Sequence, residues 1–381
     1  MFSDSAHREG MPSLEGGGYE LINQHGQSTP WQSTSKSTKA WFFGITALYV
    51  ILLTGDGVVG AILFDVYTEI YSQYLNQATA LVYCVWSSLA VWWLKRSRKP
   101  MAAADDEVSA PWSALVFIGC LNGSANFFQG TGMPHTSGLS QSLLLVLSLP
   151  IVLILSYVFL KKAPTKLSAV GAACILGGTA VSALRGSINS VGSDGGIAIF
   201  WYSTFFFALG QIFLGAERVY EDFVFGKYRA ADPMTMFCVT MWTQFFLYLV
   251  FLPTQTLPAF GGIDLSEIPG VIYDGFLCTI GTSSNHPGRP ACDGKNTALF
   301  FIYCVVDFLT YFVGLYIISK FGAPTMAVAS AIVIPISQIV YCLPFLGKYV
   351  EHFYPSDFVA LVIVLIGYTV YEWNAKHVEV E

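Results

Sequence analysis

Two acidic residues lie deep inside apolar stretches, and their side chains are the ones most able to do chemistry in this sequence. Asp56 is flanked by Gly55 and Gly57, and Asp307 lies about half-way along a later apolar stretch. A charged group in a bilayer is costly and usually faces a cavity. A desolvated carboxyl there can bind a cationic group or exchange a proton, although a carboxyl hydrogen-bonded between helices is the structural alternative. The pair therefore predicts a site for cationic or zwitterionic solutes and for protons.

Uncharged polar side chains recur near the middle of these and other apolar stretches. Each could serve helix–helix packing alone, but together they exceed what packing needs. We expect the following residues to line one substrate and proton site with the two acids: Asn122, Asn126, Gln141, Gln211, Gln244, Tyr311 and Gln338. The cores of the apolar stretches contain no Lys or Arg, which argues against phosphorylated substrates. The sequence implies no metal ion and no organic cofactor.

The elements that position these residues are membrane helices. Only 12% of the residues are charged and 54% are hydrophobic, whereas soluble proteins carry about 25% charged residues. Residues 108–160 contain no Asp, Glu, Lys or Arg, and a bilayer crossing needs about 20 mostly apolar residues. This pattern excludes a soluble enzyme, a nucleic-acid-binding protein and a disulfide-rich secreted domain. Membrane lipid is the expected surrounding, and a monomer is one state compatible with the sequence.

Ten membrane spans account for the apolar stretches and for the distribution of positive charge. With a cytosolic N-terminus, 15 of the 19 Lys and Arg residues lie on cytosolic segments, as the positive-inside rule requires. Both termini are then cytosolic. The predicted spans are 40–65, 71–94, 111–132, 136–160, 165–185, 195–217, 233–257, 296–319, 323–346 and 355–373.

Five plus five spans predict two halves of opposite orientation, an all-α inverted repeat. Pro150 and Pro335 occupy corresponding spans, and matched prolines in inverted halves mark kinked helices around a central cavity. The expected organisation is a disordered cytosolic tail (1–38), a first five-helix half (39–194), a second half (195–374) with a lumenal loop (258–295), and a cytosolic C-terminal tail (375–381).

The tail and the predicted lumenal loop add three expectations. Residues 19–22 (Tyr-Glu-Leu-Ile) fit the pattern that endolysosomal sorting adaptors read. In the loop, residues 264–278 could form a surface helix interrupted at Pro269-Gly270. Cys278 and Cys292 lie on the non-cytosolic side, where a disulfide is plausible. Closing a loop of about 15 residues would stabilise the fold by about 3 kcal/mol.

The sequence resembles the chloroquine-resistance-transporter-like family of the drug/metabolite transporter superfamily. The resemblance rests on residues 136–142 (Thr-Ser-Gly-Leu-Ser-Gln-Ser) with 147–151 (Leu-Ser-Leu-Pro-Ile). It rests also on Cys278 and residues 292–294 before the helix with Asp307, and on residues 74–77 (Tyr-Leu-Asn-Gln). It implies a ten-helix carrier of a vacuolar, lysosomal or plastid membrane that exports drugs, amino acids or short peptides from an acidic lumen, driven by protons. Asp307 matches an acidic residue of the family's cavity.

Two departures from the family pattern bear on the substrate. Asn122 stands where the best-known members have an acid, which implies a less negative cavity, and the loop has two cysteines instead of four. The leading interpretation is a proton-coupled secondary transporter working by alternating access. A glutathione or thiol transporter of a plastid envelope and a non-transporting scaffold or receptor remain as alternatives. Enzymatic activity is not expected, since no His-Glu-x-x-His motif occurs.

Overall fold

The computed structural model describes residues 36–97, 110–133, 136, 138–145, 147–160, 166–189, 196–228, 231–257, 260, 262–283, 292–350 and 355–378. Two compact units are distinguished, residues 1–42 and 43–381. The first α-helix, α2, begins in the first unit, inside the predicted tail, whereas the packing and the cavity belong to the second. The predicted sorting tetrapeptide lies outside the described residues.

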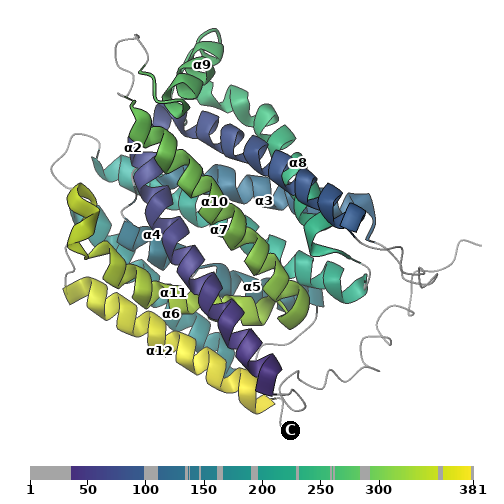
Figure 1. The fold of residues 1–381 in the computed structure, drawn as a ribbon. Helices are drawn as coiled ribbons and strands as arrows, with labels where there is room; N and C mark the ends of the chain where they lie inside the picture. Colours follow the sequence, from purple (N-terminus) through teal and green to yellow (C-terminus); the bar gives the residue numbers. More distant parts are fainter. Residues whose placement is uncertain are drawn as a thin grey trace, which may run out of the picture. The chain divides into compact units, whose positions relative to one another are not determined.

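Over these residues the chain is all-helical (Figure 1). The α-helices are α2 (Lys36–Ser97), α3 (Trp112–Gly132), α4 (Gly138–Leu145), α5 (Ser148–Leu160), α6 (Lys166–Asn189), α7 (Gly196–Lys227), α8 (Pro233–Phe251), α9 (Ile268–Thr279), α10 (Gly294–Phe321), α11 (Ala323–Tyr341) and α12 (Pro355–Val378). Two short 3-10 helices, η2 (Leu252–Thr256) and η4 (Pro344–Tyr349), follow α8 and α11.

Helix α2 contains a sharp break that separates the first two predicted spans. Thr68 has φ 57° and ψ 178°, and helical residues continue on both sides. A β-branched residue is rarely found at positive φ. The two segments, Phe43–Thr68 and Ile70–Ser97, are each long and apolar enough to cross a membrane. One continuous line of helical residues therefore contains two candidate spans.

Three elements differ from the sequence prediction. The predicted span 136–160 is two helices, because a turn closed by the Leu147 N–H to Leu144 O bond separates α4 from α5. Helix α7 runs past the predicted end at 217 to Lys227. Pro269-Gly270 does not interrupt the loop helix: α9 begins at Ile268, and Pro269 lies in its first turn, where the missing N–H needs no partner.

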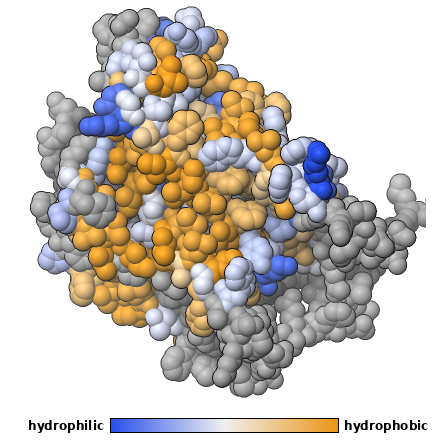
Figure 2. Space-filling view, in the orientation of Figure 1, coloured by the Kyte–Doolittle hydropathy of each residue, from blue (hydrophilic) through white to orange (hydrophobic). Residues whose placement is uncertain are grey.

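The outward surface carries the apolar side chains expected of a membrane protein. Figure 2 shows hydrophobic residues covering the middle of the face formed by α2 and α10. On α10 the exposed residues Phe301, Ile302, Val305 and Leu309 follow helical spacing. Within the described residues, two further segments, Pro233–Thr256 and Gly294–Phe321, are long and apolar enough to cross a membrane. The apolar surface and these helices give the chain membrane-protein character.

Glycines allow the closest helix contacts. A Cβ added at Gly119 of α3 would lie 2.5 Å from the Cβ of Thr243 on α8, so no larger residue fits without a shift. A Cβ at Gly178 of α6 would lie 2.6 Å from Val364 Cγ2 on α12, and these two helices run side by side (Figure 1). At both contacts the backbone of one helix therefore lies directly against a side chain of the next.

Candidate functional site

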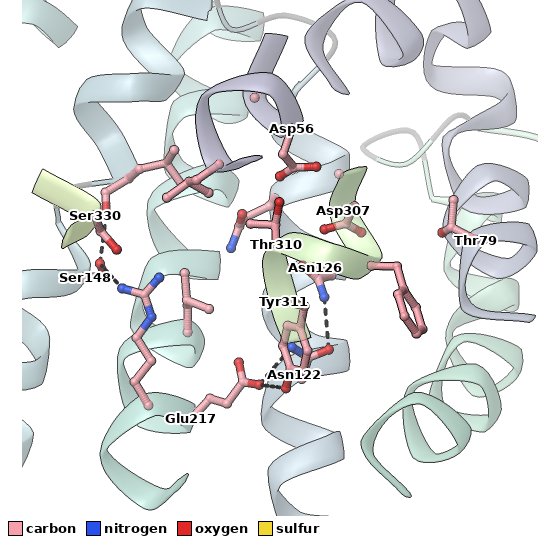
Figure 3. Close-up of a pocket in the computed structure, with 18 of the residues that line it drawn as sticks. Asp56, Thr79, Asn122, Asn126, Ser148, Glu217, Asp307, Thr310, Tyr311 and Ser330 are labelled. Atoms are coloured by element: carbon pink, nitrogen blue, oxygen red, sulfur yellow. Dashed lines mark hydrogen bonds between the residues drawn. The ribbon is translucent and has the colours of Figure 1, made fainter. Parts of the chain in front are cut away.

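A cavity of about 200 Å³ lies among the helices and is lined by residues from both predicted halves (Figure 3). Helices α2, α3, α4 and α5 contribute from the first half, and α7, α8, α10 and α11 from the second. The lining is mainly apolar and aromatic, with a limited set of polar side chains. Such a composition is typical of small-molecule sites.

The two predicted acids lie together at one end of this cavity (Figure 3). Asp307 on α10 accepts a hydrogen bond from the Tyr83 hydroxyl on α2, with 2.7 Å between Tyr83 Oη and Asp307 Oδ2. The Oδ1 atom of Asp56 is buried and has no hydrogen-bond partner. An unsatisfied buried carboxyl oxygen is costly unless a proton or a ligand reaches it. Asp56 therefore offers a free acceptor to whatever enters the cavity.

Gly55 and Gly57 leave space on both sides of Asp56 along the backbone. Tyr341 on α11 donates its hydroxyl to the Gly57 carbonyl at 3.0 Å. A Cβ at Gly55 would meet only Val306 Cγ1, at 3.6 Å, which is an ordinary van der Waals contact. The small residues thus keep the region around the carboxyl uncrowded.

A second acidic cluster lies at the other end of the cavity, around Glu217 of α7 (Figure 3). Its Oε1 atom accepts hydrogen bonds from Asn122 Nδ2 at 2.8 Å and from the Tyr311 hydroxyl at 2.6 Å. The same hydroxyl lies 3.2 Å from Oε1 of Glu221, and Asn126 donates to Asn122 Oδ1 at 3.1 Å. Glu217 is 1% exposed, and its Oε2 atom is buried with no hydrogen-bond partner. Asn122 therefore holds a carboxylate contributed by a neighbouring helix.

The expectation that the acids of the cavity have no cation beside them is wrong. Arg218, which follows Glu217 on α7, is 8% exposed and lines the cavity. Its Nη1 atom donates to the Ser148 hydroxyl at 3.2 Å. The sequence analysis assigned Arg218 to a cytosolic connection because an apolar stretch ends just before it. The helix continues, however, and turns this side chain inward.

The other predicted site residues divide between the cavity and its supports. Gln141 and Gln244 line the cavity. Gln141 donates to the Thr136 carbonyl at 2.7 Å, and Gln244 donates to the Tyr248 hydroxyl at 2.7 Å while its Oε1 atom is buried without a hydrogen-bond partner. Gln211 is fully buried but is not part of the lining.

The two predicted kink prolines lie in different settings. Pro150 is buried in the first turn of α5, just after the break between α4 and α5. Pro335 lies within α11, which is helical from Ala323 to Tyr341. The side chains of Pro335 and Gln338 lie outside the described residues.

The lining residues that the sequence did not predict include Tyr83, Glu217, Arg218 and Glu221. The sequence contained a signal for α7, because positions 217, 221 and 224 follow helical spacing. The structure buries all three side chains. Among the described residues, no group of three or more His, Cys, Asp or Glu is arranged to hold a metal ion. The arrangement suits reversible binding of a small charged solute.

The loop that was predicted to be lumenal is fixed to the helices beside the cavity. Cys278 and Cys292 form the expected disulfide. Thr279 at the end of α9 lies within hydrogen-bond distance of two hydroxyls of α2, 2.9 Å from Tyr74 and 3.2 Å from Tyr67. A Cβ at Gly275 would lie 2.5 Å from the Tyr74 ring. Helix α9 is therefore anchored to α2 on both sides of the break at Thr68.

Comparisons with known proteins agree with this architecture. The sequence model of the CRT-like, chloroquine-resistance transporter-like family matches residues 46–371. Crt homolog 3 of Dictyostelium discoideum is 25% identical over 84% of this chain and 70% of its own length, and Crt homolog 1 of the same organism is 24% identical over 84% and 72%. One solved crystal structure, at 11% identity, superposes with a TM-score of 0.51 over 87% of this chain and 97% of its own, a likeness of fold alone. The chain belongs to the CRT-like family, which is consistent with a membrane transporter.

Proposed function

We propose that this protein is a secondary active transporter of an organelle membrane. It exports small cationic or zwitterionic solutes, such as drugs, amino acids or short peptides, from an acidic lumen to the cytosol. The observation that carries this proposal is the unpartnered, buried Oδ1 atom of Asp56 beside Asp307 in a cavity lined by both halves of the chain. A carboxyl in this position can take either a proton or a cationic group, and exchange between the two couples solute movement to protons.

Alternating access is supported by equivalent packing in the two halves. Helix α3 packs against α7 and α8, the first two helices of the second half. Its counterpart α10 contacts both segments of α2: a Cβ at Gly60 would lie 3.2 Å from the Tyr303 ring, and Tyr83 bonds Asp307. Each third helix of a half thus packs on the first two helices of the other, as an inverted repeat predicts.

The remaining helices follow the same rule. Helix α5 packs against α7, with a Cβ at Gly215 only 2.6 Å from Ile151 Cγ2, while α11 contacts the first segment of α2 through Tyr341. The fifth helices, α6 and α12, pack against each other. These reciprocal contacts support two inverted halves of five spans, which alternating access would move against each other about the cavity. Both termini are cytosolic in this proposal, as the distribution of Lys and Arg predicts.

A vacuolar or lysosomal membrane is the proposed location. The disulfide beside α9 supports a lumenal position for that loop, because disulfides persist in oxidising compartments. An acidic lumen would supply the protons for transport. The plastid envelope, with glutathione or a related thiol as substrate, is the alternative outcome of the test.

The test is uptake into liposomes that contain the purified protein under an imposed pH gradient. A labelled cationic amphiphile, a basic amino acid and glutathione are offered to wild type, to Asp307→Asn and to the control Asp264→Asn. Asp264 is an exposed carboxyl of the lumenal loop. We expect gradient-dependent uptake of the basic amino acid or the amphiphile in wild type and in the control, and its loss in Asp307→Asn.

The alternatives give different results. Movement of glutathione alone would support the plastid-type thiol transporter. No movement of any of the three solutes by folded wild-type protein would contradict transport of these solutes and would favour a scaffold or receptor. Equal uptake by wild type and Asp307→Asn would show that transport does not need the Asp307 carboxyl.

A further inference from the structure

The cavity contains a buried cation whose hydrogen-bonding capacity is not filled. Arg218 is 8% exposed, and its Nη1 atom donates to Ser148, but its Nε atom is buried with no hydrogen-bond partner. A guanidinium carries five N–H donors in a planar fork that matches a carboxylate. Leaving a buried charged donor unpaired is costly. The side chain is thus prepared for an anionic group that enters the cavity.

The neighbouring carboxyls are held by other partners. Oε1 of Glu217 accepts from Asn122 and Tyr311, its Oε2 atom has no hydrogen-bond partner, and Oε1 of Glu221 is 3.2 Å from the Tyr311 hydroxyl. None of these hydrogen bonds is to the guanidinium. The Nε–H group of Arg218 therefore remains available to a further acceptor, beside Glu217 and Glu221 on the same helix.

A helix N-terminus reaches the cavity at the same place. Helix α5 begins at Ser148, and Ser148 and Leu149 both line the cavity. The first N–H groups of a helix have no partner within the helix, and the helix dipole favours an anion there. Ser148, which receives the Arg218 hydrogen bond, is itself 2% exposed. A buried serine, a buried arginine and a helix N-terminus converge on one side of the cavity.

The cavity thus carries both signs of charge. In Figure 3, Asp56 and Asp307 lie together, while Ser148 lies on another side of the pocket. Because pockets for drug-sized ligands span about 300–1,000 Å³, a cavity of about 200 Å³ suits a solute nearer to an amino acid in size. A solute that pairs with both ends must have a carboxylate as well as an ammonium group.

We propose that Arg218, positioned by its hydrogen bond to Ser148, and the N-terminus of α5 bind the carboxylate of a zwitterionic solute, an amino acid or short peptide, whose ammonium group is held by Asp56 and Asp307. This inference rests on the proposed transport function and narrows its substrate class. Cationic amphiphiles without a carboxylate would then be poorer substrates than amino acids.

The test compares lysine with lysinamide, which differ only in the carboxylate. Binding to the purified full-length protein is measured from the rise of the unfolding temperature over a range of solute concentrations, fitted to the logarithmic dependence on ligand concentration that yields Kd. Uptake into liposomes is measured in parallel. The variants are Arg218→Gln, Arg218→Lys, Ser148→Ala and the control Lys227→Gln, an exposed cation on the same helix.

We expect wild type and Lys227→Gln to bind lysine at least about tenfold more tightly than lysinamide, because hydrogen bonds between charged groups contribute that much or more. Arg218→Gln should bring the ratio close to one by weakening lysine alone, and Arg218→Lys should keep part of the preference. Ser148→Ala, which retains the guanidinium, should reduce the ratio several-fold. It serves as the second variant if Arg218→Gln does not fold.

Equal binding of the two solutes by wild type, or equal weakening of both in Arg218→Gln, would overturn the inference. Equal uptake of both solutes would overturn it while leaving the transport function intact. A preference for lysine in binding without uptake of either solute would contradict the transport function but support the carboxylate site. Neither binding nor uptake of lysine would overturn both.

Discussion

Replacing Tyr311 by Phe tests whether the second acidic cluster is held together by one hydroxyl. The Tyr311 hydroxyl is 2.6 Å from Glu217 Oε1 and 3.2 Å from Glu221 Oε1, and the ring packs 5.0 Å from that of Phe237. Phe keeps the ring contact and removes only the hydroxyl. A hydrogen bond to a charged group contributes about 1.5–3 kcal/mol. Because the shorter bond dominates, we expect the free energy of unfolding to fall by about 2 kcal/mol.

A double-mutant cycle separates this bond from other effects of the substitution. In the Glu217→Gln background the acceptor is neutral, so Tyr311→Phe should cost only about 1 kcal/mol. The coupling energy is then about 1 kcal/mol. The unfolding free energy is measured by titrating the protein in mixed micelles with a denaturing detergent. Tyr220→Phe on α7, whose ring packs against Phe117 and Phe223, is the control and should change it by less than about 0.5 kcal/mol.

A loss below about 0.5 kcal/mol, or a coupling energy of zero, would refute the reasoning. It would mean that the hydroxyl does not hold the carboxyls in solution. A loss as large in Tyr220→Phe would show that removal of any partly buried hydroxyl weakens the protein, independent of the cluster.

Three further predictions concern the scaffold, and each is checked in the same unfolding titration. Gly119→Ala should lower the free energy of unfolding by about 1–3 kcal/mol, because the new Cβ would lie 2.5 Å from a side chain of α8. The matched Gly177→Ala, whose Cβ would have no atom within 4 Å, should be neutral or stabilising. Equal effects of the two substitutions would refute this packing. Thr68→Gly should stabilise by about 1 kcal/mol by relieving the positive φ, and destabilisation would contradict that strain. Cys278→Ser should lower the free energy of unfolding by about 3 kcal/mol under oxidising conditions, and adding Cys292→Ser should lower it little further. Additive losses from the two substitutions would argue against a disulfide.

Hydrophobic patterning was sufficient to predict the helical class and most helix positions, and the buried acids of two apolar stretches identified one end of the cavity. Asp56 and Asp307 stand out because a charge inside a long apolar run has few explanations. The same reasoning did not identify Glu217 and Arg218 as residues of the cavity. Charges at the end of an apolar run are typical of a membrane boundary, so the helix was expected to end where its buried polar face begins.

The local backbone geometry at prolines was the second feature that the sequence could not predict. The sequence around Pro150 indicated a distortion, but not whether the chain bends or separates into α4 and α5. In the structure, a local hydrogen bond from the Ser148 hydroxyl to the Leu145 carbonyl, at 2.8 Å, accompanies the separation. Pro269 was expected to break a helix that it instead begins. Proline is compatible with both positions, and only the flanking packing decides between them.

The family resemblance did not predict all of the charged residues in the cavity. Asn122 in place of an acid suggested a less negative site. In the structure this amide holds Glu217 at 2.8 Å, so a carboxyl is present, contributed by α7. Such compensation between helices cannot be read from one position, because it depends on which side chains the fold brings together.

The proposed function couples movement of a solute through this cavity to movement of protons. The most direct measurement uses liposomes that contain the purified protein and a pH-sensitive dye, with no pH gradient imposed. Adding lysine outside should change the internal pH in wild type and in Asp264→Asn, but not in Asp307→Asn. Lysine uptake without any change of internal pH in wild type, or the same pH change in Asp307→Asn, would contradict the claim.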